Sequence, residues 1–404
     1  MHLSFGYVVL VCLGGSVQCQ TTPADVNKLR TDLFADYDPS VRPVTDQNDA
    51  ITLDVSFFLS TVNEVDEVDE KMVTTGYISL SWYDELLTWT PDRNNGIKEI
   101  HVIQNEIWKP DLVLKNGFKK FEEMGANFHM LRITNEGQVN WYPFEVLETR
   151  CSMDITYYPY DEQSCDITFI VWSYFDSEVS IRKSSKGIDN YEFQENSVWT
   201  VVSTKAEVIQ STYESRITFT IYLKRKPQYF VMNMIVPIIC LGILNILVFV
   251  IPVDAGEKMS YSITVFLSFA VFLTIISAEL PTNSESTSTL SFYVILQMVI
   301  GELVLVISGL QLRLHHRKSD HGISKFFVRI VKIGQCLRCV KTRCTRRGKD
   351  ITVVEKIDEN EEKQSADADV EWGDVTSAID FLCFWIFLLV NVGVTLFLFL
   401  YISG

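Results

Sequence analysis

The chain has 404 residues and a formal net charge of −16 at pH 7. This length exceeds what one compact core holds, so two or more domains are expected. Residues 21–226 carry 34 acidic and 20 basic side chains, a balance that attracts cations and repels nucleic acid, although plain solubility explains an acidic surface as well. We therefore expect no nucleic-acid partner.

The N-terminal residues 1–19 have the pattern of a secretory signal peptide. A short apolar run is followed by small residues, and cleavage is expected near Cys19. The run is too short to span a membrane. Secretion implies an oxidising compartment, so residues 20–227 are expected outside the cell, with Cys151 and Cys165 oxidised.

After the signal peptide, the apolar positions follow first a helical and then a strand-like period. Residues 24–35 have helical spacing and predict a short helix. From about residue 50 to 226, short stretches alternate between apolar and polar residues and are separated by turn residues. The predicted fold is an extracellular all-β sandwich with an N-terminal helix, followed by a four-helix transmembrane bundle.

Cys151 and Cys165 enclose thirteen residues, the centre of which reads Tyr158-Pro159-Tyr160-Asp161. A disulfide that closes a loop of this size removes about 3 kcal/mol of denatured-state entropy in the chain-entropy model. The residues alone allow two interpretations. The loop is either an ordinary staple in a secreted domain or a strapped loop of fixed shape near the membrane.

Four apolar spans follow, each with the twenty or so residues that a bilayer requires. They cover residues 229–251, 259–280, 290–312 and 379–402. Residues 313–349 contain twelve Lys and Arg against one Asp, which places this segment in the cytoplasm by the positive-inside rule. The expected division is transmembrane helices 1–3 in 228–313, a cytoplasmic loop in 314–377, and the fourth helix with a short extracellular C-terminus in 378–404.

Three features of the membrane region leave alternatives open. The acidic stretch 350–378 fits a helix leading into the fourth span or a disordered linker. The three cysteines between 336 and 344 fit a palmitoylated patch, a basic linker, or a metal site without an obvious fourth ligand. Glu302 in the third span is expected to face a packed interior, with Asn245 as a polar neighbour, or to sense protons or lipid.

The second span carries one stripe of partly polar residues at helical spacing. Its members are Glu257, Ser260, Thr264, Leu267, Val271, Thr274 and Ala278. A helix that faces only lipid has no use for hydroxyl groups in register with a carboxylate. The stripe therefore fits either a pore lining or a helix–helix interface packed through small hydroxyl residues.

Several short motifs, specific in combination, resemble those of the nicotinic-type Cys-loop receptors, which are pentameric neurotransmitter-gated channels. The resemblance runs from about residue 25 to 316 and resumes at the fourth span. It rests on the Cys151–Cys165 loop and on Val65-Asp66-Glu67, Trp82-Tyr83-Asp84, Trp108-Lys109-Pro110-Asp111, Trp172-Ser173-Tyr174, Lys224-Arg225-Lys226, Asp254-Ala255-Gly256-Glu257-Lys258 and Pro281. It favours the strapped loop over the staple and the pore over the helix–helix interface.

The resemblance implies a fivefold arrangement in which the stripe residues of the second span become rings. A ring of Glu257 carboxylates at the cytoplasmic mouth would select cations. Leu267 and Val271 would form an apolar constriction that closes the pore by dewetting. The residues that the resemblance assigns to the gating interface are Glu67, Asp161, Arg225 and Pro281.

In this family a ligand binds between subunits in an aromatic box, where a cation gains energy over ring faces. The resemblance assigns seven residues to the ligand site: Trp172, Tyr174, Tyr213, Tyr77, Lys115, Arg132 and Tyr142. The chain has no adjacent Cys-Cys pair, a shortened capping loop, and Lys115 where acetylcholine-binding members carry a Tyr, so it resembles a non-α subunit. If Lys115 and Arg132 face the cleft, a carboxylate-bearing ligand is favoured over a bare quaternary amine; otherwise one or both face solvent.

The predicted function is a ligand-gated cation-channel subunit of a homo- or heteropentamer in the plasma membrane, surrounded by lipid and opened by an unidentified small molecule. The alternative is an accessory subunit that assembles and binds ligand but needs another subunit to gate. The sequence shows no Ser-His-Asp set, glycine-rich phosphate loop or metal cluster, so no enzymatic activity, cofactor or metal is expected.

Overall fold

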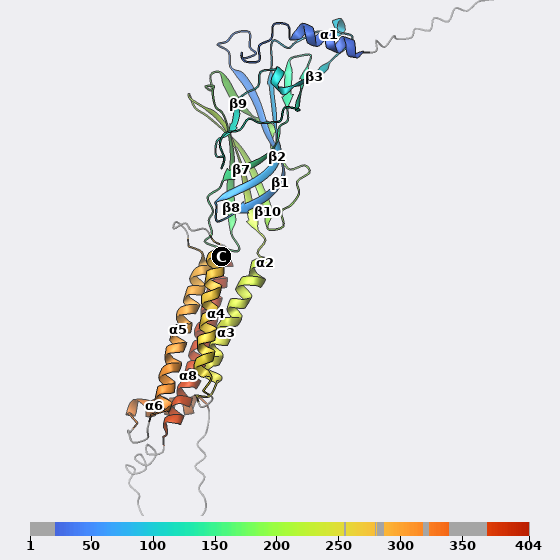
Figure 1. The fold of residues 1–404 in the computed structure, drawn as a ribbon. Coiled ribbons are helices and arrows are strands. Elements are labelled where there is room, and N and C mark those ends of the chain that lie inside the picture. The colour runs from blue at the N-terminus through green and yellow to red at the C-terminus, as the bar shows by residue number, and fades with distance from the viewer. Residues whose placement is uncertain are drawn as a thin grey trace, which may run out of the picture.

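The computed structural model describes residues 21–253, 256–278, 280, 287–317, 323–338 and 370–403. The molecule is elongated, with a β-sandwich at one end, a helix bundle at the other, and the C-terminus near their junction (Figure 1). The predicted signal peptide, most of the acidic stretch, Cys339, Cys344, Asp254 and Pro281 lie outside the described residues.

Helix α1 (Pro23–Leu33) covers the region of the predicted N-terminal helix and begins with a capping box. The Thr22 side chain accepts a hydrogen bond from the Asp25 backbone N–H, and the Asp25 carboxylate accepts one from the Thr22 N–H at 2.9 Å. This exchange satisfies two of the backbone donors that lie at a helix start. Leu29 is buried and anchors the helix on the sandwich.

Eleven strands in the described part of the chain form two sheets, which confirms the predicted sandwich. The larger sheet has the order β3-β5-β6-β2-β1-β9, with β7 also paired to β2, and the smaller has the order β10-β11-β8-β4. The strands are β1 Ile51–Asp66, β2 Lys71–Tyr83, β3 Glu99–Ile103, β4 Leu112–Leu114, β5 Met130–Thr134, β6 Gln138–Trp141, β7 Phe144–Arg150, β8 Glu162–Val171, β9 Val179–Asp189, β10 Trp199–Gln210 and β11 Ser215–Arg225. Two 3-10 turns occupy Pro91–Arg93 and Gln104–Glu106.

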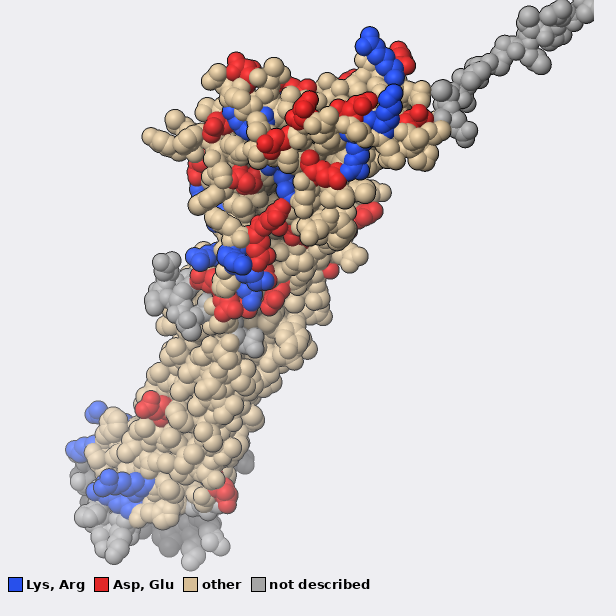
Figure 2. Space-filling view, turned by 45° about the horizontal axis from the view of Figure 1, so that its top comes forward, with Lys and Arg blue, Asp and Glu red and all other residues tan. Residues whose placement is uncertain are grey.

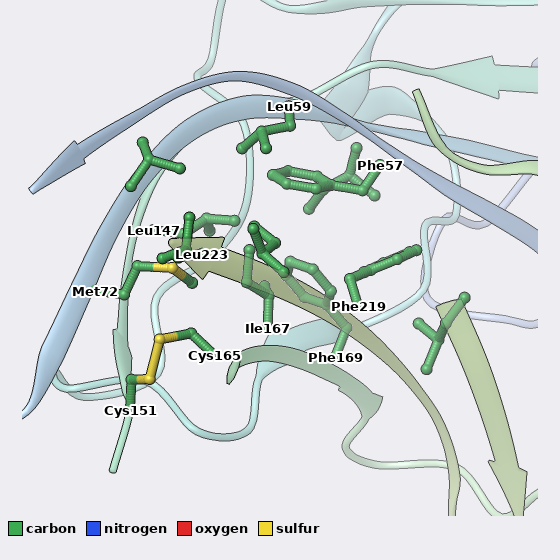
Figure 3. Packing of buried hydrophobic residues seen from close by; sticks show 14 of the residues in the cluster. Phe57, Leu59, Met72, Leu147, Cys151, Cys165, Ile167, Phe169, Phe219 and Leu223 are labelled. Carbon is green, nitrogen blue, oxygen red and sulfur yellow. A yellow bond between two sulfur atoms is a disulfide. The ribbon is translucent and has the colours of Figure 1, made fainter. Parts of the chain in front are cut away.

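The core lies between the two sheets because alternate side chains of the facing strands point inward. Every second residue of β2 from Met72 to Trp82 is buried, as expected of a strand with one face in a core. The aromatic centre of this core consists of Phe57, Phe169 and Phe219 (Figure 3). The predicted disulfide between Cys151 and Cys165 is present, with both cysteines buried at the edge of this core near Met72 (Figure 3).

Within the described residues, four helical segments are long and apolar enough to cross a membrane, as predicted. The first segment consists of α2 (Gln228–Phe230), a π-helical stretch (Val231–Ile235), α3 (Val236–Leu247) and a 3-10 turn (Val248–Val250). The others are α4 (Lys258–Ala278), α5 (Thr289–His315) and α8 (Trp372–Ser403). Charged side chains crowd the sandwich and recur at the far end, with few between them (Figure 2).

The region expected to be a cytoplasmic loop contains helical structure. Helix α6 (Lys325–Leu337) packs against α8, and an added Cβ on Gly334 would lie 3.2 Å from the Cβ of Ala378. Helix α8 begins at Trp372, so the end of the acidic stretch is helical and not a linker. Both helices therefore extend the membrane bundle at its cytoplasmic end.

Two charged side chains of the bundle have contrasting positions. Glu302 is exposed on α5, so the expectation that it faces a packed interior is wrong within this subunit. Its neighbour Gly301 is the residue that faces the buried Asn245. Lys258, the first residue of α4, is buried and forms an ion pair with Asp380 of α8, which ties the start of the second span to the fourth.

Candidate functional site

The end of strand β8 presents an exposed tryptophan that a neighbouring loop holds in place. The Trp172 side chain is 61 % exposed. The backbone N–H of Trp172 donates to the Asp111 carbonyl at 3.3 Å, and the Ser173 N–H donates to the Asp111 carboxylate at 2.6 Å. The Trp-x-Pro-Asp motif that ends at Asp111 therefore positions the Trp-Ser-Tyr motif that begins at Trp172.

One further aromatic ring contacts this tryptophan, and another is exposed on the β10–β11 hairpin, whose strand β11 pairs with β8. Phe121 packs edge-on against Trp172, with 4.7 Å between the ring centroids. Tyr213, at the tip of the β10–β11 hairpin, is 79 % exposed. Phe121 is not among the predicted site residues. Its only signal in the sequence is an aromatic residue placed inside a charged loop, Lys119 to Glu123.

Lys115 forms an ion pair with the β10–β11 hairpin, which contains the predicted capping loop. Its ammonium lies 2.7 Å and 2.9 Å from the two carboxylate oxygens of Glu214, and Arg216 reaches the same carboxylate at 3.2 Å. Strands β4 and β11 both pair with β8, so the Lys115–Glu214 contact crosses over that strand. The sequence analysis did not identify Glu214, because its role depends on a neighbour ninety-nine positions away.

Tyr174 supports the site from behind. Its hydroxyl accepts a hydrogen bond from the indole N–H of Trp108 at 3.3 Å, and the two rings lie edge to face 6.2 Å apart. Trp108 is itself almost fully buried. Tyr174 is therefore half-buried against the sandwich core. The exposed surface of the Trp-Ser-Tyr motif comes from Trp172.

The remaining predicted site residues lie on the larger sheet. Tyr77 of β2 stacks on Phe58 with 4.4 Å between centroids, and Tyr142 meets Tyr77 edge-on at 6.2 Å. The Lys186 ammonium lies 5.4 Å from the Phe58 ring centroid on this stack. Arg132 of β5 is about half exposed, and its guanidinium lies 3.5 Å from the Glu99 carboxylate. The predicted residues thus form two clusters, one on each sheet.

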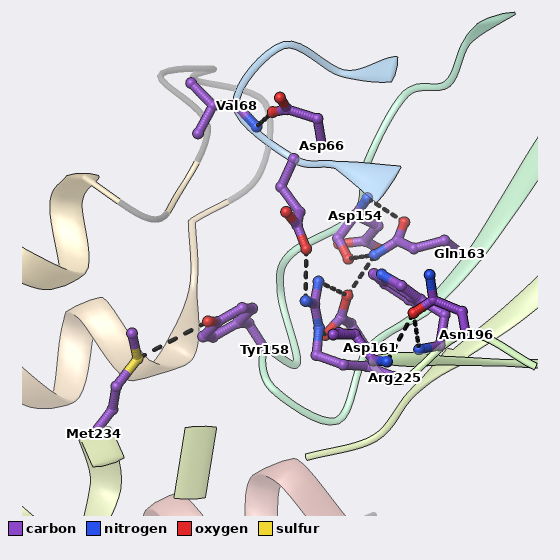
Figure 4. A network of polar contacts seen from close by, with 12 residues as sticks. Asp66, Val68, Asp154, Tyr158, Asp161, Gln163, Asn196, Arg225 and Met234 are labelled. Atoms are coloured by element: carbon purple, nitrogen blue, oxygen red, sulfur yellow. Dashed lines mark hydrogen bonds and ion pairs between the residues drawn. The ribbon is translucent and has the colours of Figure 1, made fainter. Parts of the chain in front are cut away.

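Three of the predicted gating residues meet in one buried network (Figure 4). Arg225 is 3 % exposed. Its guanidinium binds both oxygens of Asp161 at 2.7 Å and 3.0 Å and the carboxylate of Glu67 at 2.5 Å. Trp199 adds a ring face 4.2 Å from the guanidinium carbon. Burial alone would lower the pKa of Arg225, but the hydrogen bonds and charges of Asp161 and Glu67 outweigh it and raise the pKa, so the cation is secured.

The disulfide loop that carries Asp161 also touches three membrane helices. Both the N–H and the hydroxyl of Thr289, the first residue of α5, donate to the Thr156 carbonyl, at 3.1 Å and 2.7 Å. Tyr157 stacks on Tyr401 of α8 at 5.7 Å. Tyr158 lies within 3.9 Å of the Met234 sulfur in the first span. The loop is therefore a direct mechanical link between the sandwich and the bundle.

Helix α4 exposes its predicted stripe and buries its opposite face. All seven stripe residues are exposed in the subunit, and Leu267 and Val271 are 60 % and 51 % exposed. The buried residues of the helix are Lys258, Ser262, Val265, Phe269 and Ile276. The hydroxyls of Thr264 and Thr274 bond to carbonyls of their own helix, so they satisfy their donors without leaving the stripe.

The architecture defines a multi-pass plasma-membrane receptor with an extracellular N-terminal domain. The profile “Neurotransmitter-gated ion-channel ligand binding domain” matches residues 26–227, and “Neurotransmitter-gated ion-channel transmembrane region” matches residues 234–350. The chain belongs to the neurotransmitter-gated ion-channel family. Its members are receptors and not enzymes, as expected.

Similar proteins include subunits of acetylcholine receptors. The chain is 31 % identical to the neuronal acetylcholine receptor subunit alpha-6 of Mus musculus over 325 residues, which cover 78 % of the chain and 65 % of that protein. It is 31 % identical to the acetylcholine receptor subunit beta of Rattus norvegicus, with 74 % and 64 % covered. It is 31 % identical to the neuronal acetylcholine receptor subunit alpha-5 of Homo sapiens, with 76 % and 67 % covered. The chain spans a little less than two thirds of the first two relatives, and the non-α assignment stays a prediction.

Proposed function

We propose that the chain is a subunit of a pentameric cation channel that opens when a small extracellular ligand binds between subunits. The observation that carries the proposal is the exposure of the α4 stripe. Its hydroxyls and the Glu257 carboxylate lie on the face of α4 that the described helices of the same subunit leave exposed. Exposure of these groups to lipid is costly, whereas a water-filled axis solvates them.

The order of residues along the stripe suits a gated cation pore. Glu257 at the cytoplasmic end provides a ring of negative charge that attracts cations and repels anions. The adjacent Lys258 does not cancel this charge, because it is buried and paired with Asp380. Leu267 and Val271 form the apolar constriction in the middle of the helix.

We place the ligand site between subunits because its two halves lie on different sheets of one chain. The Trp172 cluster of one subunit would face the Tyr77 and Tyr142 cluster of the next, giving a site lined by aromatic rings. Binding there would shift the capping hairpin formed by β10 and β11. Strand β11 runs from this hairpin and ends at Arg225. The Arg225 network and the disulfide loop would pass the shift to the membrane helices as a change in the population of two states.

The charges beside Trp172 favour a zwitterionic ligand over acetylcholine. Within the cluster of Lys115, Glu214 and Arg216, two positive charges meet one negative charge, which leaves one net positive charge in that cluster. The Asp111 carboxylate, which accepts the Ser173 N–H, lies outside the cluster. The Nε atom of Arg216 is buried and has no hydrogen-bond partner in the described part of the chain. A ligand with a quaternary amine for the rings and a carboxylate for this surplus charge satisfies both features.

A matched pair of probes tests the ligand class. Choline and trimethylglycine share a quaternary ammonium and differ in that the second carries a carboxylate. We expect trimethylglycine to bind the purified receptor more tightly than choline or acetylcholine. Trp172→Ala should weaken binding by roughly 0.5–2 kcal/mol, while the control Tyr83→Ala, an exposed ring outside the site, should not. Tighter acetylcholine binding that depends on Trp172 would overturn the ligand class and leave the site in place.

Current recording from cells that express only this chain tests the channel itself. A cation current evoked by ligand supports the proposal. If the chain reaches the surface as a pentamer, binds ligand and yet carries current only with a second subunit, the accessory role is the correct one.

A further inference from the structure

Two adjacent residues of opposite charge lie at the cytoplasmic start of α4. Glu257 is exposed, whereas the side chain of Lys258 is only 5 % exposed. In a pore lined by α4, the carboxylate would face the permeating ions and the ammonium would not. The sign of the charge at this mouth therefore depends on which of the two side chains points to the axis.

The buried position of Lys258 depends on a partner from another helix. Burial of an ammonium group is costly unless an opposite charge compensates for the lost water. The start of a helix also carries a partial positive charge, which disfavours a lysine there. Asp380 of α8 forms an ion pair with Lys258, and the Phe249 ring centroid lies 5.6 Å from the ammonium. Within the described residues, Asp380 is the only carboxylate that pairs with Lys258.

Asp380 is in turn held by the neighbouring elements. Its side chain is 13 % exposed, and the side chains of Gln311 and Arg338 both interact with its carboxylate. Gln311 belongs to α5, and Arg338 caps the end of α6 and donates to the Ser377 carbonyl of α8 at 2.7 Å. The carboxylate thus has a fixed position from which it can hold the ammonium.

We propose that Asp380 is a positioning residue for ion selectivity, which holds Lys258 out of the pore and leaves Glu257 as the charge at the cytoplasmic mouth. This inference rests on the proposed cation pore. Without the Asp380 carboxylate, the ammonium has no buried counter-ion, and its flexible stem allows it to reach water. The nearest water is at the mouth, beside Glu257, where the ammonium would offset the carboxylate. A helix that lines no part of the pore would thereby determine which ions pass.

The test measures reversal potentials in a sodium chloride gradient, in a Leu267→Thr background so that no ligand is needed. Asp380→Asn should shift the potential toward the chloride value, and the shift should approach that of Glu257→Gln because each released ammonium offsets one carboxylate. The control Asp374→Asn removes the same charge from an exposed position of α8 and should leave the potential unchanged. The double variant Asp380→Asn/Lys258→Gln removes the released ammonium and should restore the cation preference.

Labelling of Lys258 by a water-soluble, amine-reactive reagent gives a second readout that needs no current. Mass spectrometry of the purified full-length protein should find Lys258 protected in the native chain and in Asp374→Asn, and labelled in Asp380→Asn. Protection of Lys258 in Asp380→Asn would overturn the proposal, as would a double variant that does not restore the cation preference.

The reversal potentials also separate this inference from the proposed pore. If Glu257→Gln shifts the potential and Asp380→Asn does not, the inference about Asp380 is wrong and the pore stands. If neither variant shifts the potential, the pore itself is refuted, and the role of Asp380 with it.

Discussion

Replacement of Asp161 by asparagine would test whether the buried network around Arg225 stabilises the receptor. Arg225 is 3 % exposed and contacts both oxygens of Asp161, at 2.7 Å and 3.0 Å. Asparagine keeps the shape of the side chain but removes its charge. Loss of one partner of a buried ion pair costs roughly 3–5 kcal/mol. Glu67 and the ring of Trp199 remain in place, so we expect the lower part of that range.

Glu162→Gln is the matched control, at the next residue, where β8 begins. Glu162 pairs with Lys224 at 2.7 Å, but its side chain is 64 % exposed, and an exposed pair contributes about 0–1 kcal/mol. Both variants would be compared by denaturant unfolding of the purified full-length receptor. If Asp161→Asn is no more destabilising than Glu162→Gln, the reasoning about the buried pair is refuted.

A double-mutant cycle separates the pair from the rest of the site. In an Arg225→Met background there is no buried cation to leave unpaired, so Asp161→Asn should cost much less than in the native chain. The same variants should change gating, because Asp161 belongs to the loop that touches α5 and α8. Equal costs in both backgrounds would show that Asp161 acts independently of Arg225.

Three further predictions concern the gate, the disulfide loop and a buried carboxyl. Leu267→Thr makes the apolar constriction easier to wet and should raise the spontaneous current. An unchanged current would place the gate elsewhere, and Val271 would be the next candidate. Cys151→Ser releases the loop and should abolish surface pentamers, and normal surface assembly would contradict that role. Desolvation raises the pKa of Asp84 from 3.8 to about 6, so the folded state binds the proton more tightly than the unfolded state. This stability of up to about 3 kcal/mol is fully present below pH 3.8 and is lost as pH rises from there through about 6. Asp84→Asn should lack that loss in unfolding experiments across this pH range, whereas the same pH dependence in both proteins would exclude Asp84.

Local periodicity predicted the architecture well, because strands and membrane helices each have a repeating pattern. The alternation along β2 and the stripe of α4 are visible in the sequence and recur as buried and exposed faces in the structure. Helix α6 has no such membrane-length pattern, and it packs on α8 through tertiary contacts that include the close approach at Gly334 and the pairing of Phe327 with Trp372. The direction in which Glu302 points was also mispredicted, because the neighbouring helices set the rotation of α5 about its axis.

The charges of the candidate site depend on distant partners and could not be predicted in the same way. The sequence left open whether Lys115 faces the cleft or solvent, and its ion pair with Glu214 across β8 was not predicted. Phe121 lies in no motif and becomes part of the site only because its loop places it against Trp172. Residue types and short motifs therefore identified the two clusters, while their charge balance emerged from tertiary contacts.

The reversal potential of the native channel and of Glu257→Gln tests the central claim most directly. With a sodium chloride gradient across the membrane, the proposal predicts a native reversal potential near that of sodium. It also predicts a shift toward the chloride value when the carboxylate ring is neutralised. If ligand evokes no current, the measurement moves to a Leu267→Thr background. A native reversal potential at the chloride value, or an unchanged potential in Glu257→Gln, would contradict a cation pore lined by this stripe.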